Sequence, residues 1–451
     1  MSYSLSKRFT RVIYGVIEGV IEPSLVEQVK LCLLDYLGAT NAGTRISRER
    51  ITKFLKYCQT IESGVSPIGF KERLSISSAA FVNGLSSHSA EMDDGYRFGM
   101  SHPGAPIFSA LLPIVQSRPA DIQLFYKAVI VGYEVVTRLS AAMQPSHYAK
   151  GYHPTATCGA VGVAASVATY LEASEEELHN AIVAAATCSG GSLKAIEGKS
   201  DLKPHNIANA VSVGINAAYL AMSGFKVPED GFSGDTGFFS VMSTKPNLDE
   251  LMRVESKHYG IMNVYFKPYA ACRHAHASIE AALEIRTNPS FDSSLIEKVE
   301  VRIYESVIGK HDDTNIVGVN SAKMSIPFSV ALALLRGSAS IRDFQSESIC
   351  NQTLLRLCKI VEVIGDSDLS KLVPVVRPAV VTVIQKNGIR VEQRVDLPKG
   401  EPESAMTHLE AENKFTELST YSGIANEKIE NFLNGYWDQW SSVNAKLEQL
   451  L

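Results

Sequence analysis

Histidine, lysine and acidic residues recur in short polar turns that directly precede small-residue or apolar stretches. The most prominent turn, Tyr152-His153-Pro154, leads into a run rich in glycine and alanine at residues 159–169. Small residues let backbones approach closely, so this stretch predicts a loop followed by a tightly packed helix. A histidine just before a helix lies at its positive end, which favours a bound anion and disfavours the imidazolium form. The alternative is a loop histidine that only caps a buried helix.

Other polar turns carry similar groups, and we expect them to converge on this one. Together, lysines and helix N-termini would form an anion-binding cavity suited to a substrate with two or three carboxylates. Histidine would supply an acid or base near neutral pH, and lysine would stabilise an enolate oxygen. This favours proton removal or delivery at the carbon next to a carboxylate. The residues of these turns are Glu91, Asp93, Asp94, Arg97, His102, Lys199, Lys203, His205, Lys267, Cys272, Arg273, His274 and His276.

Each acidic or basic turn also has a structural interpretation. Asp93-Asp94 is typical of a capped, solvated turn as well as of a catalytic pair. Lys199 and Lys203 share a helical face only if their loop is helical, and Pro204 argues against that. A solvated basic loop, with a helix starting only at Ile207, is the alternative there.

The histidines near residue 275 leave two further possibilities open. In an extended chain, His274 and His276 would point to the same side and could bind a metal ion. No third ligand stands at a useful spacing, so we predict no metal site. Cys272 could act as a nucleophile with a neighbouring histidine as base, but no covalent-catalysis motif surrounds it.

Composition narrows the function classes. A chain of 451 residues suggests two or more domains, and a net charge of -5 does not suggest a partner such as nucleic acid or an anionic membrane. No stretch is apolar enough to span a bilayer, and residues 1–10 lack the apolar core of a signal peptide, so we expect a cytoplasmic protein. The seven cysteines form no CxxC pair, and no GxGxxG, GxxxxGK[ST] or HExxH motif occurs.

The pattern along the chain changes near residue 270. Up to about residue 265 almost every segment predicts helix, including one at 23–40 whose apolar residues recur at helical spacing before Gly38. Strands are then predicted at 299–303, 360–363, 379–385 and 389–395, the last two forming a hairpin around Asn387-Gly388. Helices return at 410–418 and 427–451. We therefore predict a mainly α fold, with a large all-helical domain (1–268 and 402–451) and an inserted, smaller α+β domain (269–401).

An ordered series of motifs resembles the MmgE/PrpD family. The motifs are HSAEMDDGYRFGMSHPG, GYHPTATCGAVGVAA, SDLKPHNIANA, GFSGDTGFF, FKPYAACRHAHASIEAA and AKMSIPFSVALALLRG. The resemblance runs from about residue 25 to the helix at 410–420, and the combination in this order is specific. It implies a large helical domain, a smaller α+β lid, a homodimer, and no metal or organic cofactor.

The resemblance also implies roles for individual residues. His102 matches the histidine after the family's acidic turn, and His153 matches that of its GxHPT-like motif. Lys203 and Lys267 match the lysines of its KPxH-like and KPY loops. We expect His102 or His153 to move the proton and the two lysines to hold substrate carboxylates. The residues expected to contribute to substrate binding are Glu91, Asp93, Asp94, Arg97, Tyr152, His205, Cys272, His274 and His276.

Several family activities remain open at this point. The leading hypothesis is a 2-methylcitrate dehydratase-like lyase that removes a proton next to a carboxylate and expels a β-hydroxyl. An epimerase or racemase similar to iminodisuccinate epimerase is the second, and a cis-aconitate decarboxylase-like enzyme the third. A non-enzymatic binding homologue is motivated by four departures from the decarboxylase-like pattern: Glu91 for aspartate, Gly95 for threonine, Cys272 for histidine and Phe328 for tyrosine.

Overall fold

The structure is a computed structural model that describes residues 4–196, 200–253 and 259–450. It divides into two compact units. The first contains Met1–Tyr265 and Thr407–Leu451, and the second contains Phe266–Met406 between these two stretches. Lys199, which the sequence placed in a basic turn, lies outside the described residues.

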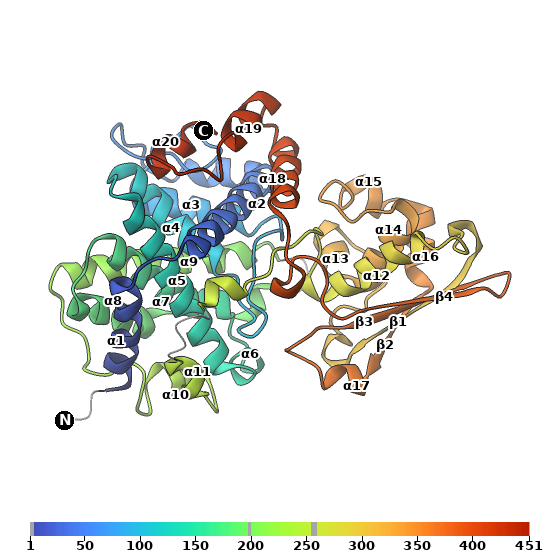
Figure 1. The fold of residues 1–451 in the computed structure, drawn as a ribbon, viewed down its shortest axis with the longest axis horizontal. Helices are drawn as coiled ribbons and strands as arrows, with labels where there is room; N and C mark the ends of the chain where they lie inside the picture. The colour runs from blue at the N-terminus through green and yellow to red at the C-terminus, as the bar shows by residue number, and fades with distance from the viewer. Residues whose placement is uncertain (1–3, 197–199, 254–258, 451) are drawn as a thin grey trace. The chain divides into compact units, whose positions relative to one another are not determined.

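The first unit is helical. Helix α7 packs between α5 and α9, with α4 against α7 and α9, α3 and α8 against α9, and α2 along α18 (Figure 1). The bounds are α1 Leu5–Glu18, α2 Pro23–Leu55, α3 Ile76–Ser87, α4 Gly104–Ser117, α5 Ile122–Met143, α6 Ser146–Ala149, α7 Pro154–Tyr170, α8 Glu175–Cys188, η1 Leu193–Ile196, α9 Lys203–Met222, α10 Phe238–Met242, α11 Leu248–Met252, η2 Gly260–Asn263, α18 His408–Ser422, α19 Asn426–Leu433 and α20 Val443–Leu447.

Small residues explain why α7 occupies the centre of this unit. Every residue of α7 is buried. A Cβ at Gly162 would lie 2.3 Å from Val136 of α5, and one at Gly214 of α9 would lie 2.5 Å from Val163. Such distances are far below van der Waals contact, so any larger side chain would force these helices apart. The predicted tightly packed helix after His153 is confirmed.

The second unit is a four-stranded mixed sheet with helices. Its strand order is β2-β1-β3-β4, with β1 parallel to β2 and antiparallel to β3. Helix α12 packs against β3 and β4, and α14 packs against β2 and α12 (Figure 1). The bounds are η3 Arg273–Ala275, α12 His276–Arg286, η4 Ser293–Leu295, β1 Ile296–Tyr304, η5 Glu305–Val307, α13 Val319–Met324, α14 Ile326–Arg336, α15 Ser346–Ile349, α16 Gln352–Lys359, β2 Val361–Asp366, α17 Ser367–Ser370, β3 Ala379–Gln385, β4 Arg390–Val395 and η6 Pro402–Ser404.

The mainly α fold class with a smaller α+β part is confirmed, and so is the β3–β4 hairpin. Strands β3 and β4 pair antiparallel, and Gly388 has the positive φ of 83° that such a tight turn favours. Within the described ranges, no helix is both long and apolar enough to cross a bilayer.

Some predicted boundaries are wrong. Helix α2 continues past Gly38 to Leu55, because Gly38 lets α2 approach Phe415 of α18 rather than ending the helix. The predicted helix at 427–451 is two short helices, α19 and α20, separated at residues 434–442. Both errors arise because tertiary packing, which local sequence patterns cannot predict, decides where these helices end.

Candidate functional site

Two histidines in the first unit share one carboxylate. His88 directly follows α3, and its Nδ1 lies 2.7 Å from Oδ2 of Asp93. The Nδ1 of His102 lies 3.4 Å from the same oxygen, and the two imidazole ring centroids are 4.7 Å apart. His88 and Asp93 are buried, whereas the His102 side chain is 14% exposed. His102 is therefore the member of this group that solvent can reach.

The hydrogen bonds of His102 define which of its nitrogens carries a proton. Its Nδ1 lies 2.6 Å from the backbone carbonyl oxygen of Asp94, which can only accept, so Nδ1 donates. In the neutral ring, Nε2 is then the unprotonated nitrogen. The backbone N–H of His102 donates to Thr155 Oγ1 at 3.1 Å, which ties this residue to the first turn of α7.

Asp94 holds this turn in place. Its carboxylate accepts hydrogen bonds from the Tyr133 hydroxyl at 2.7 Å and from the Gly104 N–H, the first residue of α4, at 3.0 Å. Burial, together with the nearby Asp35 carboxylate, raises the pKa of Asp94 to about 8. Asp94 is thus a buried anchor between the acidic turn, α4 and α5.

His153 carries its proton on the opposite nitrogen. It is the N-terminal flanking residue of α7, and its Nδ1 lies 3.2 Å from the Asn206 amide nitrogen. That amide nitrogen also donates to the Ser192 carbonyl at 3.1 Å, which fixes the amide orientation. Because the amide nitrogen only donates, His153 Nδ1 accepts and Nε2 carries the proton. Burial, reinforced by the positive charge of Lys203, holds the pKa of His153 well below its usual value, so the ring is neutral.

Lys203 is the first residue of α9 and forms an ion pair with Glu91. The predicted loop before Ile207 is wrong, because Pro204 occupies the first turn, where a missing N–H costs no helical hydrogen bond. Glu91 has a φ of 58°, a conformation that non-glycine residues rarely adopt. Its Oε1 also lies 4.0 Å from His88 Nε2, so Lys203 joins the same group of side chains.

Three helix N-termini meet around these side chains. Helix α4 begins two residues after His102, α7 begins directly after His153, and α9 begins at Lys203. Each N-terminus contributes partial positive charge, and Lys203 adds a full one. The arrangement favours an anion held next to two imidazoles whose Nε2 atoms differ in protonation. We call the residues His88, Glu91, Asp93, His102, His153 and Lys203 the imidazole cluster.

Three other predicted substrate-binding residues have different surroundings. The Tyr152 ring stacks on His147, with centroids 5.2 Å apart and planes at 12°. His205 is exposed and packs edge-on against Phe81. Arg97 is buried, with its guanidinium over the Phe98 ring. Their contribution to substrate binding stays a prediction.

The remaining predicted residues lie in the second unit. Lys267 is buried, and its predicted role with a substrate carboxylate rests on the sequence resemblance. The prediction that His274 and His276 face the same side of an extended chain is wrong. Residues 273–275 form a 3-10 helix and α12 starts at His276, so the two imidazoles diverge. His276 is buried, with Nε2 3.1 Å from the Ala271 carbonyl oxygen and Nδ1 3.0 Å from Arg273 Nη1.

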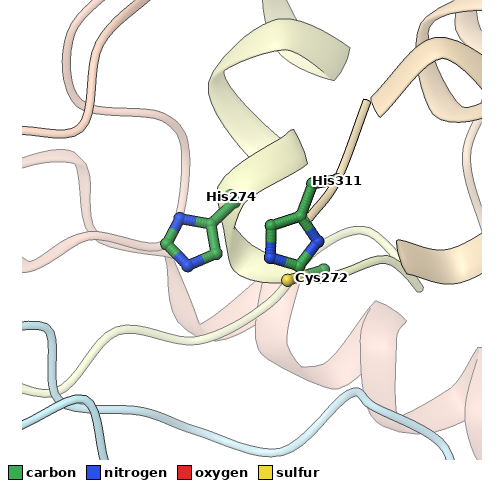
Figure 2. A group of neighbouring side chains, drawn as sticks. All are labelled: Cys272, His274 and His311. Carbon is green, nitrogen blue, oxygen red and sulfur yellow. The ribbon is translucent and has the colours of Figure 1, made fainter. Parts of the chain in front are cut away.

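His274 instead meets a histidine that the sequence did not indicate. Its ring stacks on His311 with centroids 5.0 Å apart, and the Cys272 sulfur lies beside them (Figure 2). Burial and the neighbouring His311 hold the pKa of His274 well below its usual value. The statement that no third ligand accompanies this turn is therefore wrong, because His311 comes from a loop that is distant in sequence.

Sequence reasoning missed His88 and His311 as site residues. His88 stands three residues before Glu91 and five before Asp93, a spacing that could have marked it. His88 lies, however, within residues 77–90, a small and apolar stretch that itself predicts a helix. His311 has no local signal, because only the packing of three separate segments brings it to Cys272 and His274.

Comparison with known proteins identifies the family. The model of the MmgE/PrpD N-terminal domain matches residues 7–251, and that of the MmgE/PrpD C-terminal domain matches residues 269–437. Human (Homo sapiens) cis-aconitate decarboxylase is 25% identical over 374 residues, which cover 80% of this chain and 77% of that protein. The mouse (Mus musculus) cis-aconitate decarboxylase is 24% identical over 439 residues, covering 92% and 86%. The cis-aconitate decarboxylase-like protein oryM of Aspergillus oryzae (strain ATCC 42149 / RIB 40) is 24% identical over 446 residues, covering 92% and 90%.

The two family models together span most of the chain, and the fold has the helical and α+β parts that the motifs implied. The chain belongs to the MmgE/PrpD family.

Proposed function

We propose that the protein is a lyase acting on a small di- or tricarboxylic acid through proton transfer at the carbon next to a carboxylate. The observation that carries the proposal is the complementary protonation of two histidines. His102 presents an unprotonated Nε2 in its neutral form, whereas His153 presents a protonated Nε2. One can accept a proton and the other can donate a hydrogen bond to developing negative charge.

We assign the base to His102 and charge stabilisation to His153. His102 Nε2 removes the proton from the carbon, and the electron pair moves toward the adjacent carboxylate. Lys203, the His153 Nε2–H and the helix N-termini stabilise the negative charge that develops there. A lowered pKa keeps the His153 imidazole neutral, so its Nε2–H can donate a hydrogen bond to the developing negative charge without the ring itself carrying a charge.

Dehydration is the leading reaction. After proton removal, the β C–O bond breaks, a C=C bond forms, and protonated His102 returns its proton to the departing hydroxide to give water. A hydroxy tricarboxylate such as 2-methylcitrate fits this scheme. The second candidate is decarboxylation, which the names of the relatives favour. There the C–C bond to a carboxylate breaks and CO2 leaves. For this reaction His102 must start in its doubly protonated form, so that its Nε2–H can protonate the resulting carbanion.

Epimerisation is the third outcome, in which the carbanion formed by proton removal is protonated on its other face. One experiment distinguishes the three reactions. The protein is incubated in heavy water with a panel of hydroxylated, unsaturated and amino or imino polycarboxylates, and products are followed by mass spectrometry and ultraviolet absorbance. A dehydratase gives an absorbing alkene, a decarboxylase releases CO2, and an epimerase incorporates deuterium with an unchanged carbon skeleton.

The non-enzymatic alternative is a homologue that binds such acids without converting them. It predicts that the acids raise the melting temperature but remain unchanged. That result, reproduced across the panel at high protein concentration, would contradict the lyase proposal. A homodimer remains a prediction, which the mass of the particle in solution checks.

A further inference from the structure

We propose that Cys272, His274 and His311 bind a divalent transition-metal ion of the zinc class. One donor atom from each side chain lies within 4.8 Å of the other two. Figure 2 shows the two imidazole rings side by side, with the sulfur next to them. Thiolate sulfur and imidazole nitrogen are the ligands that Zn²⁺ prefers in proteins. The proposal does not rest on the roles assigned to His102, His153 and Lys203, although Cys272 and His274 are also among the residues expected to contribute to substrate binding.

The spacing is close to that of a metal-bound set. With Zn–S near ~2.3 Å and Zn–N near ~2.0 Å, a tetrahedral ion holds its donor atoms roughly 3.3–3.7 Å apart. Donor atoms within 4.8 Å of one another reach that spacing by small side-chain rotations. Three protein ligands leave a fourth position for water or an anion.

The backbone of this region holds the ligands in fixed positions. The Cys272 N–H donates to the Lys323 carbonyl at 2.8 Å, and the Ile326 N–H donates to the His311 carbonyl at 2.8 Å. Both loops are therefore attached to residues 323–326, where α13 ends and α14 begins. A site whose ligands are supported in this way needs little reorganisation to accept an ion.

The second nitrogen of each histidine has the kind of partner that metal-bound histidines have. His311 Nδ1 lies 3.0 Å from the Met324 carbonyl oxygen, which can only accept, so Nδ1 donates and Nε2 is the ligand atom. His274 Nδ1 lies 2.5 Å from the Tyr304 hydroxyl, so this nitrogen already has a hydrogen-bond partner and Nε2 is the nitrogen left for the ion. Such outer hydrogen bonds orient the ring and select the tautomer that binds metal.

Positively charged side chains near His274 act against the binding of a cation. Arg273, Lys310 and Arg377 lie close enough to His274 to act on it electrostatically. They oppose a bare dication, but the Cys272 thiolate offsets one charge and an anion in the fourth position offsets another. We therefore expect metal binding to be accompanied by a bound anion.

We do not propose a metal ion at a second set of possible ligands. The donor atoms of His88, Asp93 and His102 also lie within 4.8 Å of one another. There the Nδ1 atoms of His88 and His102 each lie at hydrogen-bond distance from an acceptor oxygen. Hydrogen bonds therefore explain why these side chains lie close together. That group also lacks a thiolate and belongs to the imidazole cluster.

The test uses the full chain, treated with a chelator, dialysed and titrated with Co²⁺. We expect one ion per chain, a thiolate-to-cobalt charge-transfer absorption band, and loss of that band when Zn²⁺ displaces Co²⁺. Cys272→Ser should remove the band, and His311→Ala should weaken binding by at least about 10- to 100-fold. Cys350→Ser, an exposed cysteine of the same unit, is the matched control and should keep the band.

Circular dichroism and melting curves accompany each variant, and the wild-type titration decides the matter if a variant does not fold. The proposal is overturned if the wild-type chain binds no stoichiometric ion. It is also overturned if the band persists in folded Cys272→Ser, or if it disappears in Cys350→Ser.

Discussion

The Nδ1 atom of His88 lies 2.7 Å from Oδ2 of Asp93, and this contact joins the end of α3 to the acidic turn that follows it. The same oxygen lies 3.4 Å from His102 Nδ1. Asp93 therefore lies beside Nδ1 of His102, the proposed base, whereas Nε2 on the opposite side of the ring would meet the substrate.

The first prediction concerns Asp93 as a positioning residue. Asp93→Asn keeps the size of the side chain but replaces an acceptor oxygen beside two histidines. Leaving a buried donor unsatisfied costs about 1–3 kcal/mol, so we expect kcat to fall roughly 5- to 150-fold. KM should change little, because Asp93 is not proposed to touch substrate. Steady-state kinetics measures both.

The control for this variant is Asp292→Asn, an exposed carboxylate that caps residues 293–295 in the second unit. It should leave kcat unchanged. If Asp93→Asn raises KM alone with kcat intact, the carboxylate contacts substrate and the positioning role is wrong.

The second prediction concerns Lys203, which forms an ion pair with Glu91 at the start of α9. If Lys203 also holds a substrate carboxylate, Lys203→Ala should cost about 2–5 kcal/mol, or roughly 30-fold to several thousand-fold in kcat/KM. Glu91→Gln, which keeps the lysine and removes its internal competitor, should cost much less. The same kinetic assay compares the two variants.

Lys53→Ala provides a matched surface lysine, since Lys53 pairs with Glu49 on an exposed face of α2. Its kcat/KM should equal that of the wild type. A Lys203→Ala enzyme with nearly unaltered kcat/KM would remove Lys203 from the proposed site.

Some features of the fold could be predicted from the sequence alone. The small-residue stretch after His153 contained enough information to predict a buried helix, because glycine and alanine at that density suit close helix packing. The Asn387-Gly388 turn predicted its hairpin for a similarly local reason. Lys203 was misplaced in a loop because Pro204 was weighed as a helix breaker, when the first turn tolerates it.

The contacts that define the site depend on long-range packing. His88 meets His102 and His153 because α3, α4 and α7 end or begin at one place, and no periodicity in the sequence encodes that meeting. His311 is the clearest case. Its approach to Cys272 requires the α13–α14 segment to hold two distant loops together, which local patterns do not report.

The third prediction concerns the protonation of His153. Its folded-state pKa lies well below 6.5, and the Asn206 contact places its proton on Nε2. In ¹⁵N-labelled protein at pH 5.5, we expect two-dimensional NMR to show His153 as a neutral ring with a protonated Nε2. Asn206→Ala should remove the preference for this tautomer while the ring remains neutral, because burial is the main cause of the low pKa. A cationic His153 at pH 5.5 would contradict the assigned donor role.

The fourth prediction links a buried histidine to acid stability. His147 is buried, donates from Nδ1 to the Met242 carbonyl at 3.0 Å, and accepts at Nε2 from the Thr157 hydroxyl at 2.8 Å. Burial lowers the pKa of His147 from 6.5 to about 4. Below pH 6.5 the unfolded chain therefore binds a proton that the folded chain does not, so the free energy of unfolding falls as the pH falls. The loss from this group amounts to about 3 kcal/mol by pH 4.

Asp94 acts in the opposite direction, since its pKa is raised to about 8 and the folded state binds its proton more readily. The measurement is therefore a difference between variants. Denaturant unfolding at pH 7 and pH 4.5 should show a smaller loss of stability for His147→Gln than for the wild type, because glutamine can donate and accept in the same place without titrating. His205→Gln, at an exposed position, should lose as much stability as the wild type. Equal losses in wild type and His147→Gln would mean that His147 is not kept neutral by its burial.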